Sequence, residues 1–392
     1  MDFEIPEELK MVQSMVREFV TDQLKPLERS ILGRAADLSD ATMYLPLEKE
    51  QELIELVKGL GLWGVSVPEE LGGAGLDTLG NCLVEEELAQ TIVPFSFGDV
   101  TPVLFDCNEE QKGKYFTPVF DRQRYAYLAL LEPGREASEV DKLRFRAEKK
   151  DGGYVLDGKK VSLSRPGEDY FAVVFAVTEP AETPRGGVTC FLVDKDTPGF
   201  LVSGDGEKMG WEAQVREPIF LVFDHCQVPM ESILGEEGNA FLLGKTWLPL
   251  RRLVRSARCV GAAQRILEEA TIQAQSWQSF GQLISGRPSV RAALADIATS
   301  IHAARLVVFQ AAWKADRGDS IRREAAMVKL FATQTIHLVA DNAAHIFNAP
   351  AYVAGLPMEV FCRNALAMSA TNFALQLQRN IVARDILKGL KV

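Results

Sequence analysis

The sequence has few of the residues that mark a metal centre, a disulfide framework or a polyanionic partner. Its 392 residues include only four histidines and six cysteines, and no two cysteines are spaced as C-x-x-C. This pattern favours reduced, mostly buried thiols, and the histidines lack metal-ligand spacing, so we expect no metal site. The net charge of −11 disfavours nucleic acid and anionic membranes as partners, because both attract basic patches.

Long apolar runs are also missing. No stretch is long enough to span a bilayer, and the first ten residues, MDFEIPEELK, are acidic, whereas an export signal is basic and then apolar. We therefore expect a cytoplasmic protein without a membrane span. The remaining composition, 47% hydrophobic and 25% charged, is that of an ordinary globular chain large enough for two or three subdomains.

Apolar periodicity divides the chain into three parts. Residues 1–122 show helical spacing and predict an N-terminal α-helical domain. Residues 123–232 hold short apolar runs and turn signals such as Asp151-Gly152 and Asp157-Gly158, which predict a middle antiparallel β-barrel or sandwich. Residues 233–392 predict a C-terminal four-helix bundle, whose last helix runs from about 358 to 387. The expected fold class is α+β, with strands at 125–131, 154–156, 171–177, 188–193 and 219–223.

The stretch LGLWGVSVPEELGGAGL, residues 60–76, is the most distinctive segment. Its glycines permit a tight loop after a helix end, a pattern that by itself is typical of an ordinary buried turn. Its residue order, however, resembles a segment of the flavin-dependent acyl-CoA dehydrogenases. KMGW at 208–211 and LGEEGNAF at 234–241 resemble further segments of that family. The resemblance covers nearly the whole chain and implies the family's helix, strand, helix architecture.

The resemblance also implies a reaction: a carboxylate removes the α-proton of an acyl thioester while FAD accepts the β-hydride. The family's usual base lies in a Y-E-G-T turn, and the matching residues 371–374 place Asn372 at the base position. Asparagine cannot accept a proton at physiological pH. Some members carry the base on the first long C-terminal helix, where this chain has Arg251. The sequence therefore predicts no intact catalytic residue.

The family's contacts to the flavin ring are also replaced. Leu131 stands where the resemblance places a threonine facing the isoalloxazine, so a polar contact is absent. The family's K-x-W-I-T-N strand reads Lys160 to Arg165 here, with Ser162 at the tryptophan position and Ser164 at the threonine position. Of the threonine's contact only a hydroxyl, that of Ser164, remains.

The contacts expected for the ADP half of FAD differ as well. The family's R-x-Q-F-G, which reaches the flavin diphosphate of a neighbouring subunit, becomes Trp277 to Gly281 and keeps Phe280. Losing the arginine removes a charge-assisted contact of roughly 1.5–3 kcal/mol. The family's Q-x-x-G-G becomes His345 to Ala349, with Asn348 at a glycine position. Any one change is compatible with ordinary variation, but together they predict FAD that is weakly bound, shared with a partner or absent.

The acyl-CoA pocket gives a mixed pattern. Phe241 and Arg252 match family positions near the CoA, whereas Pro249 replaces an aspartate. Arginines 251, 252, 255 and 258 concentrate positive charge on an acidic protein. A solvated, salt-bridged helix face explains them as well as a phosphate site does.

These features favour a catalytically silent subunit of a heteromeric acyl-CoA dehydrogenase of fatty acid or steroid side-chain catabolism. A homologous subunit would supply the base and most flavin contacts, and the resemblance implies electron-transfer flavoprotein as a partner of the complex. Apolar bundle faces imply an oligomer, expected to be a tetramer. Two alternatives stay open: a non-redox lyase or hydratase acting on acyl-CoA in the same pocket, and a non-enzymatic scaffold.

Overall fold

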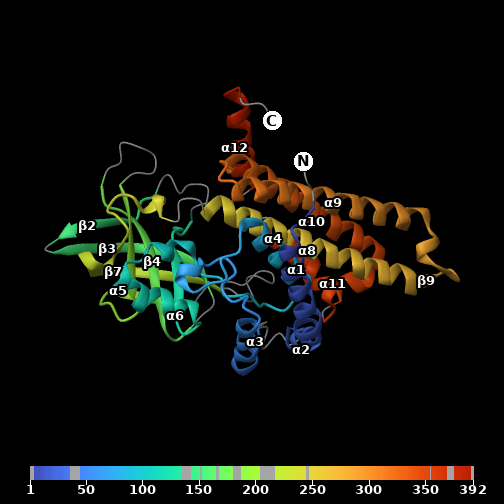
Figure 1. Cartoon of the computed structure of the whole chain (residues 1–392), viewed down its shortest axis with the longest axis horizontal. Coiled ribbons are helices and arrows are strands. Elements are labelled where there is room, and N and C mark those ends of the chain that lie inside the picture. Colours follow the sequence, from blue (N-terminus) through green and yellow to red (C-terminus); the bar gives the residue numbers. More distant parts are fainter. Residues whose placement is uncertain are drawn as a thin grey trace. The chain divides into compact units, whose positions relative to one another are not determined.

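The computed structural model describes residues 4–35, 45–134, 143–150, 152–164, 167–179, 187–203, 217–243, 247–353, 355–368 and 375–389. The chain forms two compact units, and Figure 1 labels most of their helices and several of their strands. Unit 1 comprises Met1–Ser66, Gly75–Phe97 and Leu248–Val392, and unit 2 comprises Val67–Ala74 and Gly98–Trp247. Helices make up most of unit 1 and unit 2 holds the large sheet, so the α+β class is confirmed. The three-domain division at residues 122 and 232 stays a prediction.

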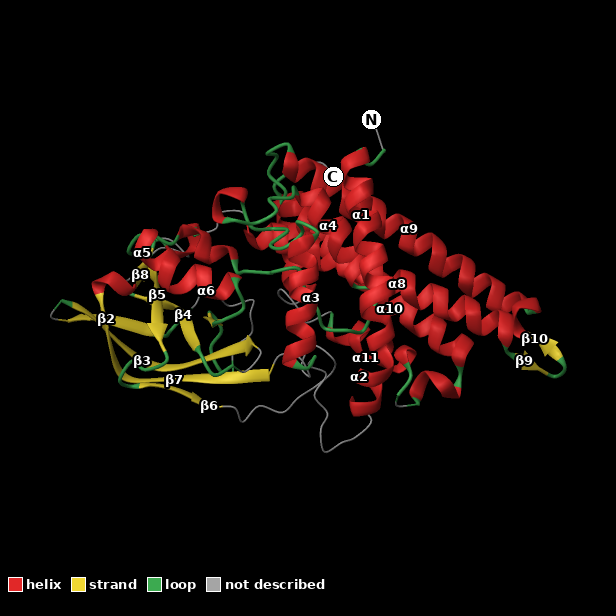
Figure 2. Ribbon diagram, turned by 60° about the horizontal axis from the view of Figure 1, so that its bottom comes forward, coloured by secondary structure: helices red, strands yellow, loops and turns green. Residues whose placement is uncertain are grey.

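Unit 1 joins helices from the two ends of the chain. Its N-terminal elements are α1 (Glu7–Phe19), η1 (Val20–Leu24), η2 (Lys25–Leu27), α2 (Glu28–Ala35), α3 (Leu47–Gly59) and α4 (Thr78–Leu88). Its C-terminal elements are α8 (Trp247–Ser276), β9 (Gln278–Ser279), β10 (Gln282–Leu283), η9 (Ile284–Gly286), α9 (Pro288–Asp316), α10 (Arg322–Phe347), η10 (Ala349–Tyr352), α11 (Pro357–Ala367) and α12 (Leu375–Leu387). Figures 1 and 2 show α8, α9 and α10 running side by side, as expected of a bundle.

Helix α9 is apolar but largely uncovered. Its mean hydropathy reaches 1.4, and 22% of that stretch is buried. Among the described residues it is the one helix long and apolar enough to cross a membrane, which is weak evidence for a span because bundle helices meet the same criterion. An apolar helix left this exposed by its own chain is typical of a protein interface.

The single helix expected from 358 to 387 is wrong. Helix α11 ends at Ala367, and α12 begins at Leu375. The carbonyl oxygen of Met368, the C-cap residue of α11, accepts a hydrogen bond at 2.6 Å from Nζ of the buried Lys329. A cation at a helix C-terminus stabilises exposed carbonyls and the negative end of the dipole, which favours ending the helix there.

Helix α4 is the ionic centre of unit 1. Its N-cap Asp77 accepts a hydrogen bond from the backbone N–H of Gly80 at 2.7 Å, which starts the helix. Three consecutive glutamates follow near its end, and each pairs with an arginine on a different helix. The pairs are Glu85 with Arg258 (2.7 Å), Glu86 with Arg305 (2.8 Å) and Glu87 with Arg17 (2.6 Å). Successive residues point about 100° apart on a helix, so one short run can reach α8, α9 and α1.

The backbones of α4 and α8 also approach closely. A Cβ built on Gly261 of α8 would lie 1.9 Å from the backbone oxygen of Glu86. No side chain fits at that distance, so this crossing requires glycine.

Unit 2 is built on an eight-stranded sheet with the order β6-β7-β3-β2-β4-β5-β8, in which β1 pairs with β4. The strands are β1 (Tyr125–Ala129), β2 (Arg146–Lys150), β3 (Gly153–Ser164), β4 (Tyr170–Val177), β5 (Val188–Asp194), β6 (Phe200–Ser203), β7 (Glu217–Pro229) and β8 (Ile233–Leu234). The short helical elements of unit 2 are η3 (Glu69–Leu71), η4 (Pro102–Asp106), α5 (Glu109–Gln111), η5 (Lys112–Phe116), α6 (Thr117–Phe120), η7 (Met230–Ser232) and η8 (Ala240–Leu242).

The sheet buries both of its faces, which explains the nearly continuous apolar sequence of β4. Phe171, Val173 and Phe175 pack on one side with the aromatic residues of η5. The alternating residues Ala172, Val174 and Ala176 pack on the other side with Tyr127 and Phe191 of β1 and β5, among others. Period-two alternation thus sends each side chain into one of two cores.

Two local expectations need correction. Asp157-Gly158 is not a hairpin turn: β3 continues through it as a bulge against β7, and Gly158 has a φ of 125°. A bulge and a hairpin turn both favour glycine, because each needs a residue with positive φ. Strand β1 runs parallel to β4, so the sheet is mixed rather than wholly antiparallel. The chain between them leaves β1 to form the β2–β3 hairpin before returning as β4.

Candidate functional site

The structure describes one of the two positions at which the family places its catalytic base. Asn372 lies outside the described residues. Arg251 lies near the start of α8, partly buried, next to the buried Arg252. At the alternative position a guanidinium therefore stands where a carboxylate would be needed, and a guanidinium stays protonated in proteins.

Two of the ring-facing positions lie where the chain after β1 runs beside β3. The backbone N–H of Val161 donates to the carbonyl oxygen of Leu131 at 2.9 Å, and an isolated bridge pairs Leu131 with Val161, the residue before Ser162. Ser162 is buried with 2% of its surface exposed, and Leu131 is partly buried. The side chain of Ser164 lies outside the described residues. Leu131 and Ser162 thus lie on neighbouring chain segments, but their side chains point to opposite faces because successive residues of a strand alternate.

A buried ion pair lies directly behind this edge. Nζ of Lys160 is 3.4 Å from Oε1 of Glu132 and donates to the carbonyl oxygen of Leu130 at 3.3 Å. The same ammonium lies 4.9 Å from the centre of the Phe145 ring. The carboxylate of Glu132 also accepts the backbone N–H groups of Arg144 at 2.9 Å and Phe145 at 2.8 Å. The carboxylate of Glu132, three residues after β1, is therefore joined both to β3 and to the two residues that precede β2.

Burial and the hydrogen bonds of the pair shift the pKa values of both Lys160 and Glu132 downward. It lowers the pKa of Lys160 from 10.5 to about 8, although the charge of Glu132 opposes the shift. Burial raises the pKa of Glu132, but the N–H of Phe145 and the charge of Lys160 outweigh it and leave that pKa lowered. Sequence reasoning missed the pair; the available signal was a lysine inside an apolar strand.

Trp277 and Phe280 lie on a β-hairpin between α8 and α9. Strands β9 and β10 pair antiparallel, and Phe280 and Gly281 form the two-residue turn with φ values of 54° and 75°. Both values are positive, as type I′ turns require. Phe280 is 98% exposed and Trp277 52% exposed, which leaves two aromatic side chains uncovered on one short element.

His345 and Asn348 lie at the end of α10. His345 is exposed on its last turn, 3.9 Å from the carboxylate of Asp341. Asn348 has φ 57° and ψ −132°, a conformation that suits glycine and strains other residues. The backbone therefore keeps a glycine-type geometry although the side chain is no longer glycine.

The two expected substrate residues lie in different units. Phe241 belongs to η8 of unit 2, with its ring 5.8 Å from that of Phe175. Arg252 belongs to α8 of unit 1 and is 7% exposed. Its backbone oxygen accepts the hydroxyl of Ser256 at 2.7 Å.

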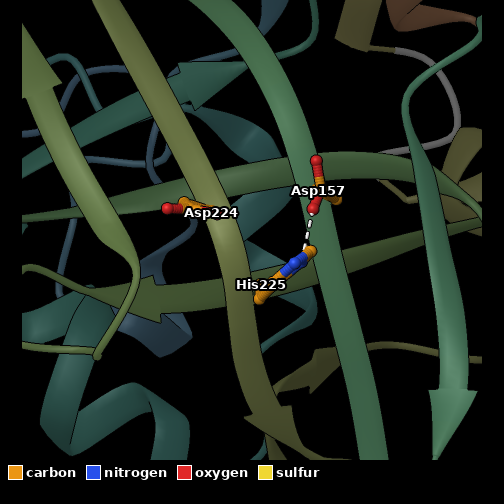
Figure 3. A group of neighbouring side chains, drawn as sticks. All are labelled: Asp157, Asp224 and His225. Carbon is orange, nitrogen blue, oxygen red and sulfur yellow. Dashed lines mark ion pairs between the residues drawn. The ribbon is translucent and has the colours of Figure 1, made fainter.

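One group of exposed side chains has the composition of a metal site. Asp157, Asp224 and His225 each offer one ligand atom within 4.8 Å of the others. Nδ1 of His225 lies 2.7 Å from Oδ2 of Asp157, and Figure 3 shows these two side chains facing each other. That ion pair accounts for the imidazole's nearest contact, and all three residues are exposed, so we assign no metal to them.

The residues at the expected flavin positions do not match the chemistry of FAD. Leu131 offers no side-chain hydrogen bond to the ring, and Trp277 offers no charge to a diphosphate. The hydroxyl of Ser162 is the only side-chain hydroxyl described at these positions. We therefore derive no redox step from this chain's own residues.

Family models match three consecutive parts of the chain. They are the acyl-CoA dehydrogenase N-terminal domain at residues 6–123, the middle domain at 128–221 and the C-terminal domain at 242–387. The chain is 32% identical to an acyl-CoA dehydrogenase of Bacillus subtilis (strain 168), over 98% of this chain and 99% of that one.

Two solved structures are similar over their whole length. A chain from electron transferring flavoprotein of Acidaminococcus fermentans has a TM-score of 0.84 at 29% identity, covering 99% of this chain and 100% of that one. Butyryl-CoA dehydrogenase from Megasphaera elsdenii has a TM-score of 0.82 at 25% identity, with the same coverage. The resemblance seen in the motifs is confirmed: the chain belongs to the acyl-CoA dehydrogenase family.

Proposed function

We propose that this protein is the catalytically silent subunit of a heteromeric acyl-CoA dehydrogenase. The observation that carries the proposal is the lack of a carboxylate at both positions where the family places its base: Asn372 at one and Arg251 at the other. A group that cannot take up a proton cannot start α,β-dehydrogenation. A homologous subunit then supplies the base, and electrons leave the complex to an electron-transfer flavoprotein.

The exposed apolar surface of unit 1 supports the assembly part of the proposal. Large apolar side chains at least 39% exposed lie on α8, α9, α10 and the β9–β10 hairpin. They are Ile272, Trp277, Phe280, Leu283, Leu306, Trp313, Phe331 and Leu338. Uncovered apolar side chains gathered on neighbouring elements favour a subunit interface, and a mixed tetramer is the assembly we propose.

In this assembly the residues of the chain line the flavin and acyl-CoA sites but take no part in proton or hydride transfer. Leu131, Ser162 and Ser164 border the space beside the flavin ring, and Trp277, Phe280, His345 and Asn348 border its ADP half. Phe241 and Arg252 contact the acyl-CoA. FAD is bound weakly by this chain, shared with the partner, or absent from it.

Co-expression tests the proposal. The partner is a homologous acyl-CoA dehydrogenase chain that keeps both the base glutamate and the diphosphate arginine. We expect this chain alone to be colourless, and the pair to co-purify as a yellow mixed tetramer that reduces an artificial electron acceptor with an acyl-CoA. Sedimentation gives the stoichiometry, and visible absorption gives the flavin content.

Two controls separate the subunits' roles. Replacing the base glutamate of the partner subunit by glutamine should nearly abolish turnover, because removing a general base lowers the rate roughly 10²–10⁴-fold. Asn372→Glu in this chain, expressed alone, should leave it inactive, because a base without a hydride acceptor has no reaction to perform. Turnover by the unmodified chain without a partner would contradict the proposal, and enoyl-CoA hydration by colourless protein would favour the non-redox alternative.

A further inference from the structure

A cavity of about 520 Å³ opens in unit 1 between residues 25–33 and the start of α11. Lys25, Glu28 and Arg29 line one side, and Gly355 and Pro357 line the other. Figures 1 and 2 both place α2 beside α11. The volume is within the range of small-molecule sites, roughly 300–1,000 Å³.

The charge of Glu28, the carboxylate in this cavity, is balanced by an ion pair with an arginine. Oε2 of Glu28 lies 3.0 Å from a guanidinium nitrogen of Arg265, and Oε1 accepts the hydroxyl of Thr91 at 2.8 Å. Lys25 and Arg29 differ: within the described ranges, neither side chain has an ion pair or hydrogen bond. Two cations without an ionic partner in the described part of the chain therefore line one cavity of a protein whose net charge is −11.

The opposite wall adds positive potential and room. Pro357 is the first residue of the eleven-residue helix α11, whose N-cap Leu356 makes no side-chain capping bond in the described structure. Pro357 itself has no backbone N–H to donate, but its place in the wall sets the positive end of the α11 dipole at this side of the cavity. A Cβ built on Gly33 or Gly355 would meet no described atom within 4 Å, so both backbones border open space.

We propose that this cavity binds a phosphorylated small molecule. Lys25 and Arg29 hold the phosphate, and the positive end of the α11 dipole adds to their attraction, because phosphate prefers cationic donors and helix N-termini. Leu32 and Pro357 provide apolar contacts for the rest of the ligand. The site uses residues of unit 1 alone and is independent of the proposed dehydrogenase role.

Calorimetric titration of the full chain tests the proposal, with pyrophosphate, ADP and succinate as probes at low salt. We expect saturable binding of pyrophosphate or ADP and none of succinate. The double variant Lys25→Gln/Arg29→Gln should bind at least tenfold more weakly, since each lost charge-assisted contact is worth about that factor. Lys388→Gln removes an exposed cation at the end of α12 and should change nothing.

A steric variant keeps both cations and blocks the space. Gly33→Leu fills the cavity from α2, where leucine also favours the helix, so binding should disappear while thermal stability is kept or raised. Gly59→Leu, at the end of α3 and equally open, is the matched control. The proposal is overturned if neither phosphate probe binds, if succinate binds as tightly as pyrophosphate, or if the cation and Gly33 variants bind like the unmodified chain.

Discussion

The charge of the buried Lys160 is stabilised by Glu132, which lies 28 positions earlier in the chain. Its ammonium is 0% exposed, and Glu132 does not fully offset the loss of hydration. Because the folded pKa is about 8 and the ordinary value is 10.5, the unfolded chain binds more protons between these pH values. Stability therefore rises with pH across that window, by roughly 3 kcal/mol for the full shift.

We expect urea unfolding to reveal this rise between pH 8 and 10.5 in the unmodified chain and not in Lys160→Met. Below pH 8 the lysine is charged in both states, so the slope should be absent there. Lys159→Met, at the neighbouring exposed position of β3, should keep the slope of the unmodified chain. Equal slopes in all three proteins would mean that Lys160 titrates normally.

For single residues, the sequence identified the positions of the family's flavin contacts, but it did not reveal which side chains contact each other. The resemblance pointed to Leu131 and Ser162, and the structure pairs Leu131 with Val161, the residue before Ser162. It did not reveal Lys160 with Glu132, because the strand register that joins them is absent from the periodicity of either segment. The glycine-type backbone at Asn348 was equally hidden, since only φ and ψ disclose it.

Among the contacts between elements, the crossing of α4 and α8 leaves the least room for a side chain at a described glycine, Gly261. Gly261→Ala should lower the free energy of unfolding by roughly 1–3 kcal/mol or more, because the added methyl group meets the backbone oxygen of Glu86, which cannot rotate away. Gly33→Ala, in the open part of α2, should raise it by about 0.5–1 kcal/mol. Denaturant midpoints of the two variants measure the difference, and equal effects would show that the helices can move apart.

Element type was more predictable than element ends. The five expected strands were found, because β-branched and aromatic runs between turn residues are a strong local signal. The continuation of β3 through Asp157-Gly158 was missed because a bulge and a turn use the same residues. The end of α11 was missed because Lys329, which binds the carbonyl oxygen of the C-cap residue Met368, comes from another helix.

For the whole molecule, the β9–β10 hairpin is the feature that we expect to govern assembly. Phe280→Asn should leave the isolated chain as stable or slightly more stable, because asparagine tolerates positive φ and Asn-Gly suits a type I′ turn. The same change should weaken association with a homologous subunit. Sedimentation over a dilution series measures it, with Leu47→Asn, an exposed leucine at the start of α3, as the control. Unchanged association of Phe280→Asn would place the interface elsewhere.

The three glutamates of α4 also constrain the order in which the chain can fold during synthesis. Residues 85–87 leave the ribosome early, but Arg258 and Arg305, which neutralise two of them, are made more than 170 and 215 residues later. Unit 2, encoded almost without interruption by residues 98–247, is complete before either arginine exists. Glu87 can pair with Arg17 at once, but Glu85 and Glu86 must wait for their arginines until α8 and α9 have been translated. A ribosome that pauses before residue 305 holds a finished sheet and an unfinished bundle.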